Sequence, residues 1–71
     1  MANIITKLKE FRKEMKISQQ ELAQLVGVRR ETIVHLENNR YNPSLEMALK
    51  IAEIFDCHVE ELFQLNKKVE K

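Results

Sequence analysis

Five polar side chains between residues 29 and 35 could recognise another molecule through hydrogen bonds: Arg29, Arg30, Glu31, Thr32 and His35. The Arg30 guanidinium can donate two hydrogen bonds in one plane, which matches the two acceptors of guanine, and Glu31 can accept from the amino group of cytosine. Thr32 can contact a thymine methyl or a phosphate, and His35 lies about one helical turn further on, on the same side. These residue types suit the reading of base edges in a DNA major groove. The alternative for each is an ordinary solvated helix face.

Two short helices around a glycine are predicted to position these side chains. Ser18 and Glu21 have the spacing of a capping box, which satisfies free N–H groups at a helix start, so we expect a helix over residues 18–26. Gly27, the only glycine in the chain, stands where that helix must stop, because glycine adopts the left-handed conformation without a Cβ clash. A second helix is expected over residues 29–38. Two helices joined in this way are the pattern of a DNA-binding helix-turn-helix, whose second helix lies in the major groove.

Apolar residues at steps of three and four predict three further helices, over about residues 3–16, 44–55 and 59–65. The two longer ones have recognisable apolar stripes, which we expect to be buried. The stripes consist of Ile4 or Ile5, Leu8, Phe11 and Met15 in the first helix, and of Leu45, Ala48, Leu49, Ala52 and Phe55 in the fourth.

The starts of two of these helices carry capping residues. Asn3 is a candidate N-cap for the first helix, and Ser44 for the fourth, with Asn42-Pro43 as the alternative start. The fold class predicted from these signals is all-α, a compact five-helix domain over residues 1–66 followed by a polar tail over residues 67–71.

The chain of 71 residues has room for one domain only. Its net charge of +1 does not by itself indicate nucleic acid. The charges are unevenly distributed: residues 1–16 carry +3, residues 17–43 are balanced, residues 44–66 carry −4 and residues 67–71 carry +2. A basic front and an acidic back would orient the molecule on a polyanion, although solvated helix faces explain most individual charges equally well.

The sequence gives little support for a metal site or for catalysis. Cys57 and His58 are adjacent, but a structural metal site needs about four ligands, and the only other histidine is His35. No histidine, cysteine or carboxylate set has the spacing of a nucleophile with its base, and there is no glycine-rich phosphate loop. We therefore expect neither an enzyme nor a metal site, and no cofactor or small-molecule ligand.

The beginning of the chain, MANIITK, lacks a continuous apolar stretch before its charges begin, and no segment approaches a membrane-spanning length. A single cysteine excludes an internal disulfide framework. A cytoplasmic protein without a membrane partner is the expectation.

The segment SQQELAQLVGV, followed by TI, LEN, NRYNPSL, ALKIAEIF and EELF, resembles the Cro and phage-repressor class (the xenobiotic-response-element class) of helix-turn-helix proteins. The resemblance is strongest to the small, single-domain bacterial and archaeal regulators of that class, and it covers roughly residues 4–65. The joint spacing of these segments is far more specific than any one of them. It implies sequence-specific binding of double-stranded DNA by a transcriptional regulator.

The resemblance also suggests roles for residues outside the base-reading set. In the family the residue matching Arg12 pairs with a glutamate near the end of the recognition helix, and Glu37 occupies that position here; the alternative is two independent surface charges. The residue matching Gln19 donates to a phosphate in related repressors, and the helix N-terminus adds partial positive charge there. Arg29 stands where the family usually has a capping serine or threonine, so we expect it to contact a phosphate instead.

The loop after the second of these helices lies where the family fold follows the DNA backbone. Asn38, Arg40 and Tyr41 are therefore expected to contact sugar and phosphate, which fixes register without reading sequence. Tyr41 serves equally well as a lid over the core. Asn39 replaces a glycine that is common in the family, and asparagine also tolerates a left-handed backbone.

The last predicted helix has more apolar residues than one helix can bury beneath itself in so small a domain. Phe63 and Leu65 are therefore candidates for a dimer interface, and Phe63 is an equal candidate for the core.

Two functional hypotheses follow. The first is a homodimeric repressor on a near-palindromic operator, with half-sites about 34 Å apart. The second is an antitoxin or protein-interaction module that uses the acidic face of residues 44–66 and binds DNA weakly or not at all.

Overall fold

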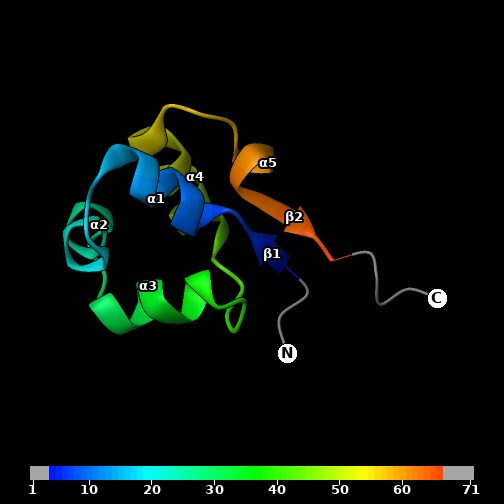
Figure 1. Ribbon diagram of the computed structural model, residues 1–71. Helices are drawn as coiled ribbons and strands as arrows, with labels where there is room; N and C mark the ends of the chain where they lie inside the picture. Colours follow the sequence, from blue (N-terminus) through cyan, green and yellow to red (C-terminus); the bar gives the residue numbers. More distant parts are fainter. Residues whose placement is uncertain (1–3, 67–71) are drawn as a thin grey trace.

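The computed structural model describes residues 4–66, which form five helices and one small sheet (Figure 1). In chain order the elements are β1 (Ile4–Thr6), α1 (Leu8–Met15), α2 (Gln19–Val26), α3 (Arg30–Glu37), α4 (Leu45–Phe55), α5 (Val59–Leu62) and β2 (Phe63–Leu65). The five predicted helices are all present, but the fold is all-α only approximately, because both ends of the described chain contribute a strand.

The two strands correct the predicted bounds of the first and last helices. The first helix begins at Leu8 rather than near residue 3, and the last ends at Leu62 rather than at residue 65. β1 and β2 pair antiparallel, with Ile4 opposite Leu65 and Thr6 opposite Phe63. Strands of three residues are too short to show an alternating pattern in the sequence, and the pairing joins segments almost sixty residues apart. The predicted cap Asn3 lies outside the described residues.

Capping side chains begin α2 and α4, as the sequence predicts. The Glu21 amide donates to Ser18 Oγ at 3.0 Å, and the Ser18 amide donates to Glu21 Oε1 at 2.7 Å, which completes the capping box. The Met47 amide donates to Ser44 Oγ at 3.1 Å. Ser44 is therefore the N-cap of α4, and the alternative start at Asn42-Pro43 is wrong.

Four left-handed residues follow the ends of α1, α2, α3 and α4: Lys16, Gly27, Asn39 and Asp56, with φ between 54° and 86°. After each of them the next amide donates to a carbonyl five residues back; the Arg40 amide, for example, donates to the His35 carbonyl at 3.0 Å. This Schellman geometry satisfies carbonyls that would otherwise lack a partner. The predictions for Gly27 and Asn39 are confirmed.

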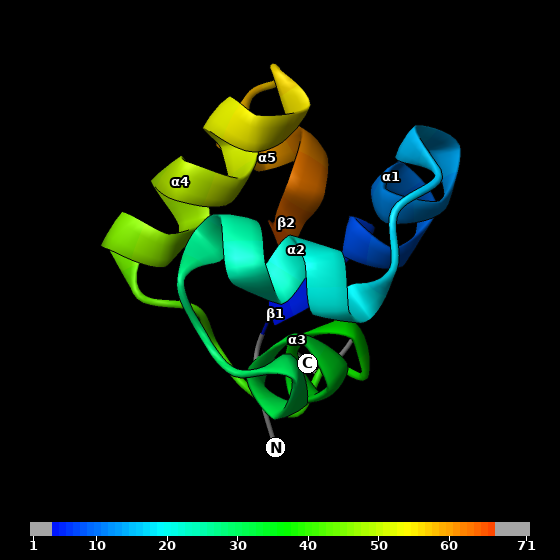
Figure 2. The ribbon, with the colours of Figure 1, turned by 90° about the vertical axis from the view of Figure 1, so that its left-hand side faces the viewer.

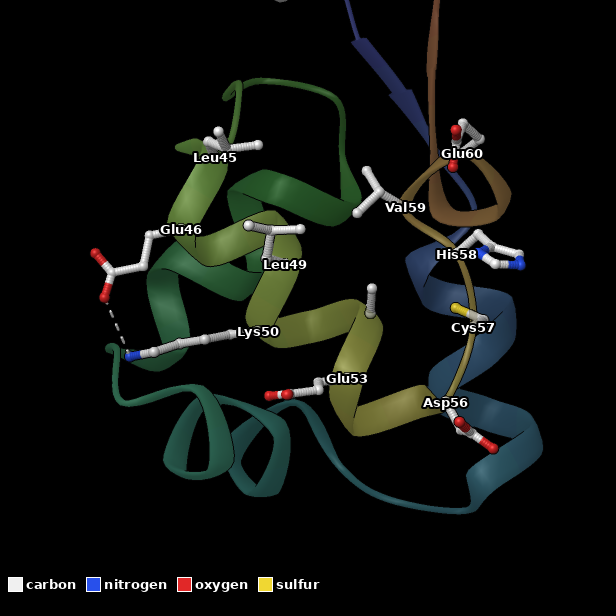
Figure 3. A pocket seen from close by; sticks show the side chains of 11 residues that line it. Leu45, Glu46, Leu49, Lys50, Glu53, Asp56, Cys57, His58, Val59 and Glu60 are labelled. Carbon is white, nitrogen blue, oxygen red and sulfur yellow. Dashed lines mark ion pairs between the residues drawn. The ribbon is translucent and has the colours of Figure 1, made fainter.

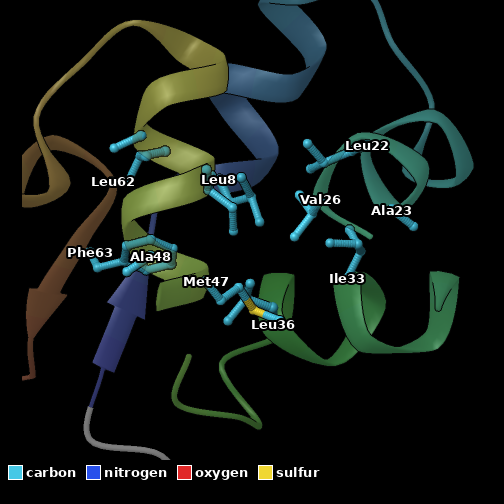
Figure 4. Packing of buried hydrophobic residues seen from close by; sticks show 12 residues of the cluster. Leu8, Leu22, Ala23, Val26, Ile33, Leu36, Met47, Ala48, Leu62 and Phe63 are labelled. Carbon is cyan, nitrogen blue, oxygen red and sulfur yellow. The ribbon is translucent and has the colours of Figure 1, made fainter. Parts of the chain in front are cut away.

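The core is formed by apolar side chains from all five helices and β2 (Figure 4). Leu22 and Val26 of α2 lie opposite Ile33 of α3, and Leu62 of α5 closes the other side. The fully enclosed side chains are Leu8, Leu22, Ile33, Leu36, Ile51 and Leu62.

The buried face of α4 differs from the predicted stripe. Met47 and Ile51 are buried, whereas Leu45 and Leu49 are 74% and 54% exposed. α4 has apolar residues around most of its circumference, so its sequence allows more than one buried stripe. The contacts with α2 and α5 select the face that carries Ile51.

The arrangement of the helices leaves one side of α3 open. In both ribbon views α3 lies at one end of the molecule beneath α2, while α4 and α5 occupy the opposite end (Figures 1 and 2). α2 and α3 are in extensive contact. Their shared core therefore fixes the outer face of α3 relative to the rest of the domain.

Candidate nucleic-acid interface

The outer face of α3 carries the side chains that the sequence singled out for base reading. Ile33 and Leu36 are buried, whereas Arg30, Glu31 and His35 are exposed on the other side of the helix. Thr32 is half-buried at the edge of this face, so only part of its side chain can be reached. Within residues 4–66 no hydrogen bond or ion pair engages the side chains of Arg30, Glu31 or His35.

The start of α3 lacks a side-chain cap. Arg29 is the N-cap residue in extended geometry, and no side-chain hydrogen bond caps the helix there. The Thr32 amide donates to the Arg29 carbonyl at 3.0 Å. The amides of Arg30 and Glu31, at the very start of α3, can therefore face an anion next to the exposed Arg29 side chain.

A buried ion pair joins α1 to the end of α3. Arg12 Nε donates to Glu37 Oε2 at 2.6 Å, and its Nη2 donates to Oε1 at 3.3 Å. The side chains are only 11% and 3% exposed, and Arg12 Nη1 also donates to the Ile17 carbonyl at 3.0 Å. A buried charge requires such partners, because its desolvation is otherwise uncompensated. The pair holds α3 against the turn between α1 and α2.

Gln19, the first residue of α2, belongs to the same network. Its Nε2 donates to Glu37 Oε1 at 3.1 Å. The sequence indicated a phosphate contact for this amide but not the contact with Glu37. An amide nitrogen carries two hydrogens, so one can bind Glu37 while the other serves a second acceptor.

The loop between α3 and α4 is open to solvent at the residues expected to follow the DNA backbone. Asn38, Arg40 and Tyr41 are all exposed. Tyr41 is 39% exposed, so part of its side chain is available for a contact with the DNA backbone. Asn39 adds a contact that the sequence did not reveal, because its Oδ1 accepts from the Thr6 amide at 3.1 Å. The turn after α3 is therefore tied to strand β1.

The two candidates for a dimer interface lie in different surroundings. Phe63 is 8% exposed and belongs to the core, so its assignment to an interface is wrong, and the alternative assignment to the core is right. Leu65 is 64% exposed on β2. Of the two candidates, Leu65 therefore remains available to a dimer interface.

Cys57 and His58 stand apart from this surface, between α4 and α5. Burial raises the pKa of the Cys57 thiol, and the charges of Glu61 and Asp56 raise it further. Among the described residues there is no group of three or more histidine, cysteine or carboxylate side chains that could hold a metal ion. No helix in the same part of the chain is long and apolar enough to cross a membrane.

A family model described as helix-turn-helix matches residues 8–62, and the chain belongs to this family, in its Cro and C1 class. It is a transcriptional regulator with a helix-turn-helix DNA-binding domain, and it is not an enzyme.

Several relatives match over most of their length. An uncharacterised HTH-type transcriptional regulator from Archaeoglobus fulgidus is 55% identical over 58 residues, which is 82% of each chain. One from Methanothermobacter thermautotrophicus is 46% identical and covers 87% of this chain and 91% of its own. The regulator YgzD from Bacillus subtilis is 40% identical, over 87% and 94% of the two chains.

Solved structures of DNA-binding regulators share the fold. The restriction-modification controller protein C.AhdI from Aeromonas hydrophila superposes with a TM-score of 0.69 at 35% identity, over 76% of this chain and 78% of its own. The N-terminal DNA-binding domain of SinR from Bacillus subtilis gives a TM-score of 0.69 at 33% identity, over 76% and 80%.

Proposed function

We propose that the chain is a homodimeric repressor that inserts α3 of each protomer into a major groove of a near-palindromic operator. The observation that carries this proposal is the outer face of α3, where Arg30, Glu31 and His35 project without partners among the described residues. A repressor needs no more than occupancy of its operator. We also propose a cytoplasmic location, where such a regulator meets its DNA.

The four base-reading residues have separate roles. Arg30 donates two hydrogen bonds to a guanine, and Glu31 accepts from a cytosine amino group while its charge repels poorly placed phosphates. His35 contacts a base one turn further along α3. Thr32, half-buried at the edge of the helix, meets a thymine methyl or a phosphate.

Five residues around α3 contact the sugar–phosphate backbone: Gln19, Arg29, Asn38, Arg40 and Tyr41. They lie at the N-terminus of α2, at the N-cap of α3 and in the loop that follows α3. Such contacts fix the position and orientation of α3 but carry no sequence information.

Dimerisation places two copies of α3 one turn of DNA apart, about 34 Å. The protomer measures 38 × 23 × 21 Å, so the centres of two protomers side by side can be separated by a distance of that order. We place the contact at the exposed Leu65 on β2.

The proposal is tested by selecting random duplex DNA with the wild-type protein and with Arg30→Ala in parallel. We expect a short inverted repeat whose guanine preference weakens in the variant. Recovery of an inverted repeat that is unchanged in Arg30→Ala would keep the function and transfer the reading to Glu31 or His35. No enrichment over competitor DNA would contradict the proposal and favour a protein-interaction module.

A further inference from the structure

A groove between α4 and α5 is not used by the proposed contacts with DNA. α4, the connection after it and the start of α5 line this groove (Figure 3). No residue of α3 or of the loop between α3 and α4 lines it. The groove therefore stays accessible when α3 lies in the major groove.

The inside of the groove is apolar. Leu49 of α4 and Val59 of α5 project into the same hollow from its two sides, with Leu45 near one end (Figure 3). Leu45 is 74% and Leu49 54% exposed. An exposed apolar surface rimmed by polar residues is the kind of surface that binds another protein.

The rim of the groove is acidic. Four carboxylates surround it, Glu46, Glu53, Asp56 and Glu60, against one lysine, Lys50, which gives a charge of −3 with His58 neutral. Lys50 Nζ lies 3.8 Å from Glu46 Oε2, so its charge is already shared with a rim carboxylate. The groove repels DNA phosphates and attracts a cationic partner.

The same charges disfavour a second copy of this chain as the occupant. A twofold contact brings the same surface of both copies together. Each copy contributes four rim carboxylates and one lysine, so a twofold contact would bring eight carboxylates together with only two lysines. Like charges facing each other across an interface are unfavourable.

The apolar residues of α4 in the groove form a stripe along which a helix of a partner protein can lie. Leu45, Leu49 and Ala52 of α4 line the groove at steps of four and three. From Leu45 to Ala52 the stripe covers seven helical steps, about 10 Å, which is the distance between residues i and i+7 of a second helix lying along it.

We propose that the α4–α5 groove binds a helical segment of a partner protein that carries apolar side chains at steps of three and four, flanked by lysine or arginine. The regulator would then hold DNA with α3 and a second protein with the opposite end of the domain. This proposal does not depend on the repressor assignment.

The test uses two synthetic helical peptides of about 18 residues, five turns long. One has leucines at i, i+4 and i+7 with lysines elsewhere, and the other has glutamates in place of the lysines. Binding is measured by fluorescence anisotropy and by the alkylation rate of Cys57, which lines the groove and is the only cysteine in the chain. The variants are Leu49→Gln and, as the matched control, Leu25→Gln, since Leu25 is 59% exposed on α2 outside the groove.

We expect the lysine peptide to bind at least about tenfold more tightly than the glutamate peptide and to slow alkylation of Cys57. Leu49→Gln should weaken that binding about tenfold, because a large apolar contact is lost, and should leave DNA binding intact. Leu25→Gln should behave as wild type. DNA binding measured in the same samples separates failure of the groove from failure of the proposed function.

Three results would overturn the inference. The first is equal affinity for both peptides, and the second is an unchanged alkylation rate of Cys57 at peptide saturation. The third is a sedimentation experiment in which Leu49→Gln, but not Leu25→Gln, converts a dimer into a monomer. That result would assign the groove to a second copy.

Discussion

At the scale of single residues, Glu37 is a charged residue whose side chain is almost fully buried. Its side chain is 3% exposed, and its carboxylate accepts hydrogen bonds from both Arg12 and Gln19. Among the described residues no buried side-chain nitrogen or oxygen lacks a partner. Glu37 is also the last residue of α3. The same carboxylate therefore joins α1, α2 and α3 and holds α3 in place.

Glu37→Gln should lower the free energy of unfolding by about 3–5 kcal/mol, because Arg12 is left as a buried, unpaired charge. Urea denaturation at neutral pH measures the change. Lys50→Ala is the control, since its pair with Glu46 is 52% and 81% exposed, and it should cost no more than about 0.5 kcal/mol. The double variant Arg12→Met, Glu37→Leu leaves no buried charge and should recover much of the lost free energy of unfolding. If the double variant is destabilised as much as Glu37→Gln, an unpaired charge is not the cause.

Gly27→Ala isolates the cost of backbone conformation. Gly27 has φ of +86°, and a Cβ placed there meets no atom within 4 Å, so any loss comes from the left-handed backbone alone. We expect the free energy of unfolding to fall by about 1–2 kcal/mol. Lys16→Gly, at φ of 61°, is the inverse control and should raise it by up to about 1 kcal/mol. A thermal-melting series in which both variants shift in the same direction would refute this account.

At the scale of the elements, the β1–β2 ribbon connects the two ends of the described chain to the helices. Thr6 is the central residue of this connection. Its Oγ1 donates to the Leu62 carbonyl at 3.0 Å and accepts from the Leu8 amide, the first of α1, at 3.0 Å. Its own amide donates to Asn39 after α3. One residue therefore joins the ribbon to α1, α5 and the turn that follows α3.

Thr6→Val removes the hydroxyl but keeps the shape of the side chain. The Leu8 amide and the Leu62 carbonyl lose a partner, and we expect a loss of about 1–2 kcal/mol in the free energy of unfolding. Hydrogen exchange should show faster opening at the start of α1. Thr6→Ser keeps both hydrogen bonds and should lie within about 0.5 kcal/mol of wild type; identical losses in the two variants would show that the hydroxyl contributes nothing.

At the scale of the whole molecule, the charges are distributed unevenly along the chain. Residues 1–16 carry +3 and residues 44–66 carry −4. Acidic residues of α4, α5 and the connection between them surround the groove. α4 and α5 lie at the end of the domain opposite α3 (Figure 1). The net charge of +1 conceals this separation. The salt dependence of DNA binding should therefore follow the number of contacts with phosphates and not the net charge.

DNA binding by the dimer should weaken steeply as salt rises. If Arg29 and Arg40 of each protomer neutralise phosphates, the logarithm of the association constant should fall with a slope of about −4 against the logarithm of salt concentration. Arg40→Gln should reduce the magnitude of that slope by about 2, since each dimer loses two contacts. Fluorescence titrations on the selected operator measure it, and Arg30→Ala serves as the control for loss of a base contact. A flat affinity between low and physiological salt would exclude this mode of binding.

The sequence by itself determined the local features of α2, α3 and α4, above all where these helices begin and end. Ser18, Glu21, Gly27 and Ser44 define helix ends through contacts with residues no more than five positions away, and such contacts are visible in the order of residues. The buried face of α3, with Ile33 and Leu36, follows from helical spacing alone. The family was also readable, because several such features recur at fixed spacing.

Only the tertiary structure decided the features that depend on distant parts of the chain. The β1–β2 pairing joins two segments too short to be recognised separately, and it shortens both terminal helices. The buried stripe of α4 was ambiguous because that helix is apolar on several sides, and packing against α2 and α5 left Leu45 and Leu49 in the groove. The hydrogen bonds from Gln19 to Glu37 and from Thr6 to Asn39 likewise have no local signal, since each depends on how separate elements pack.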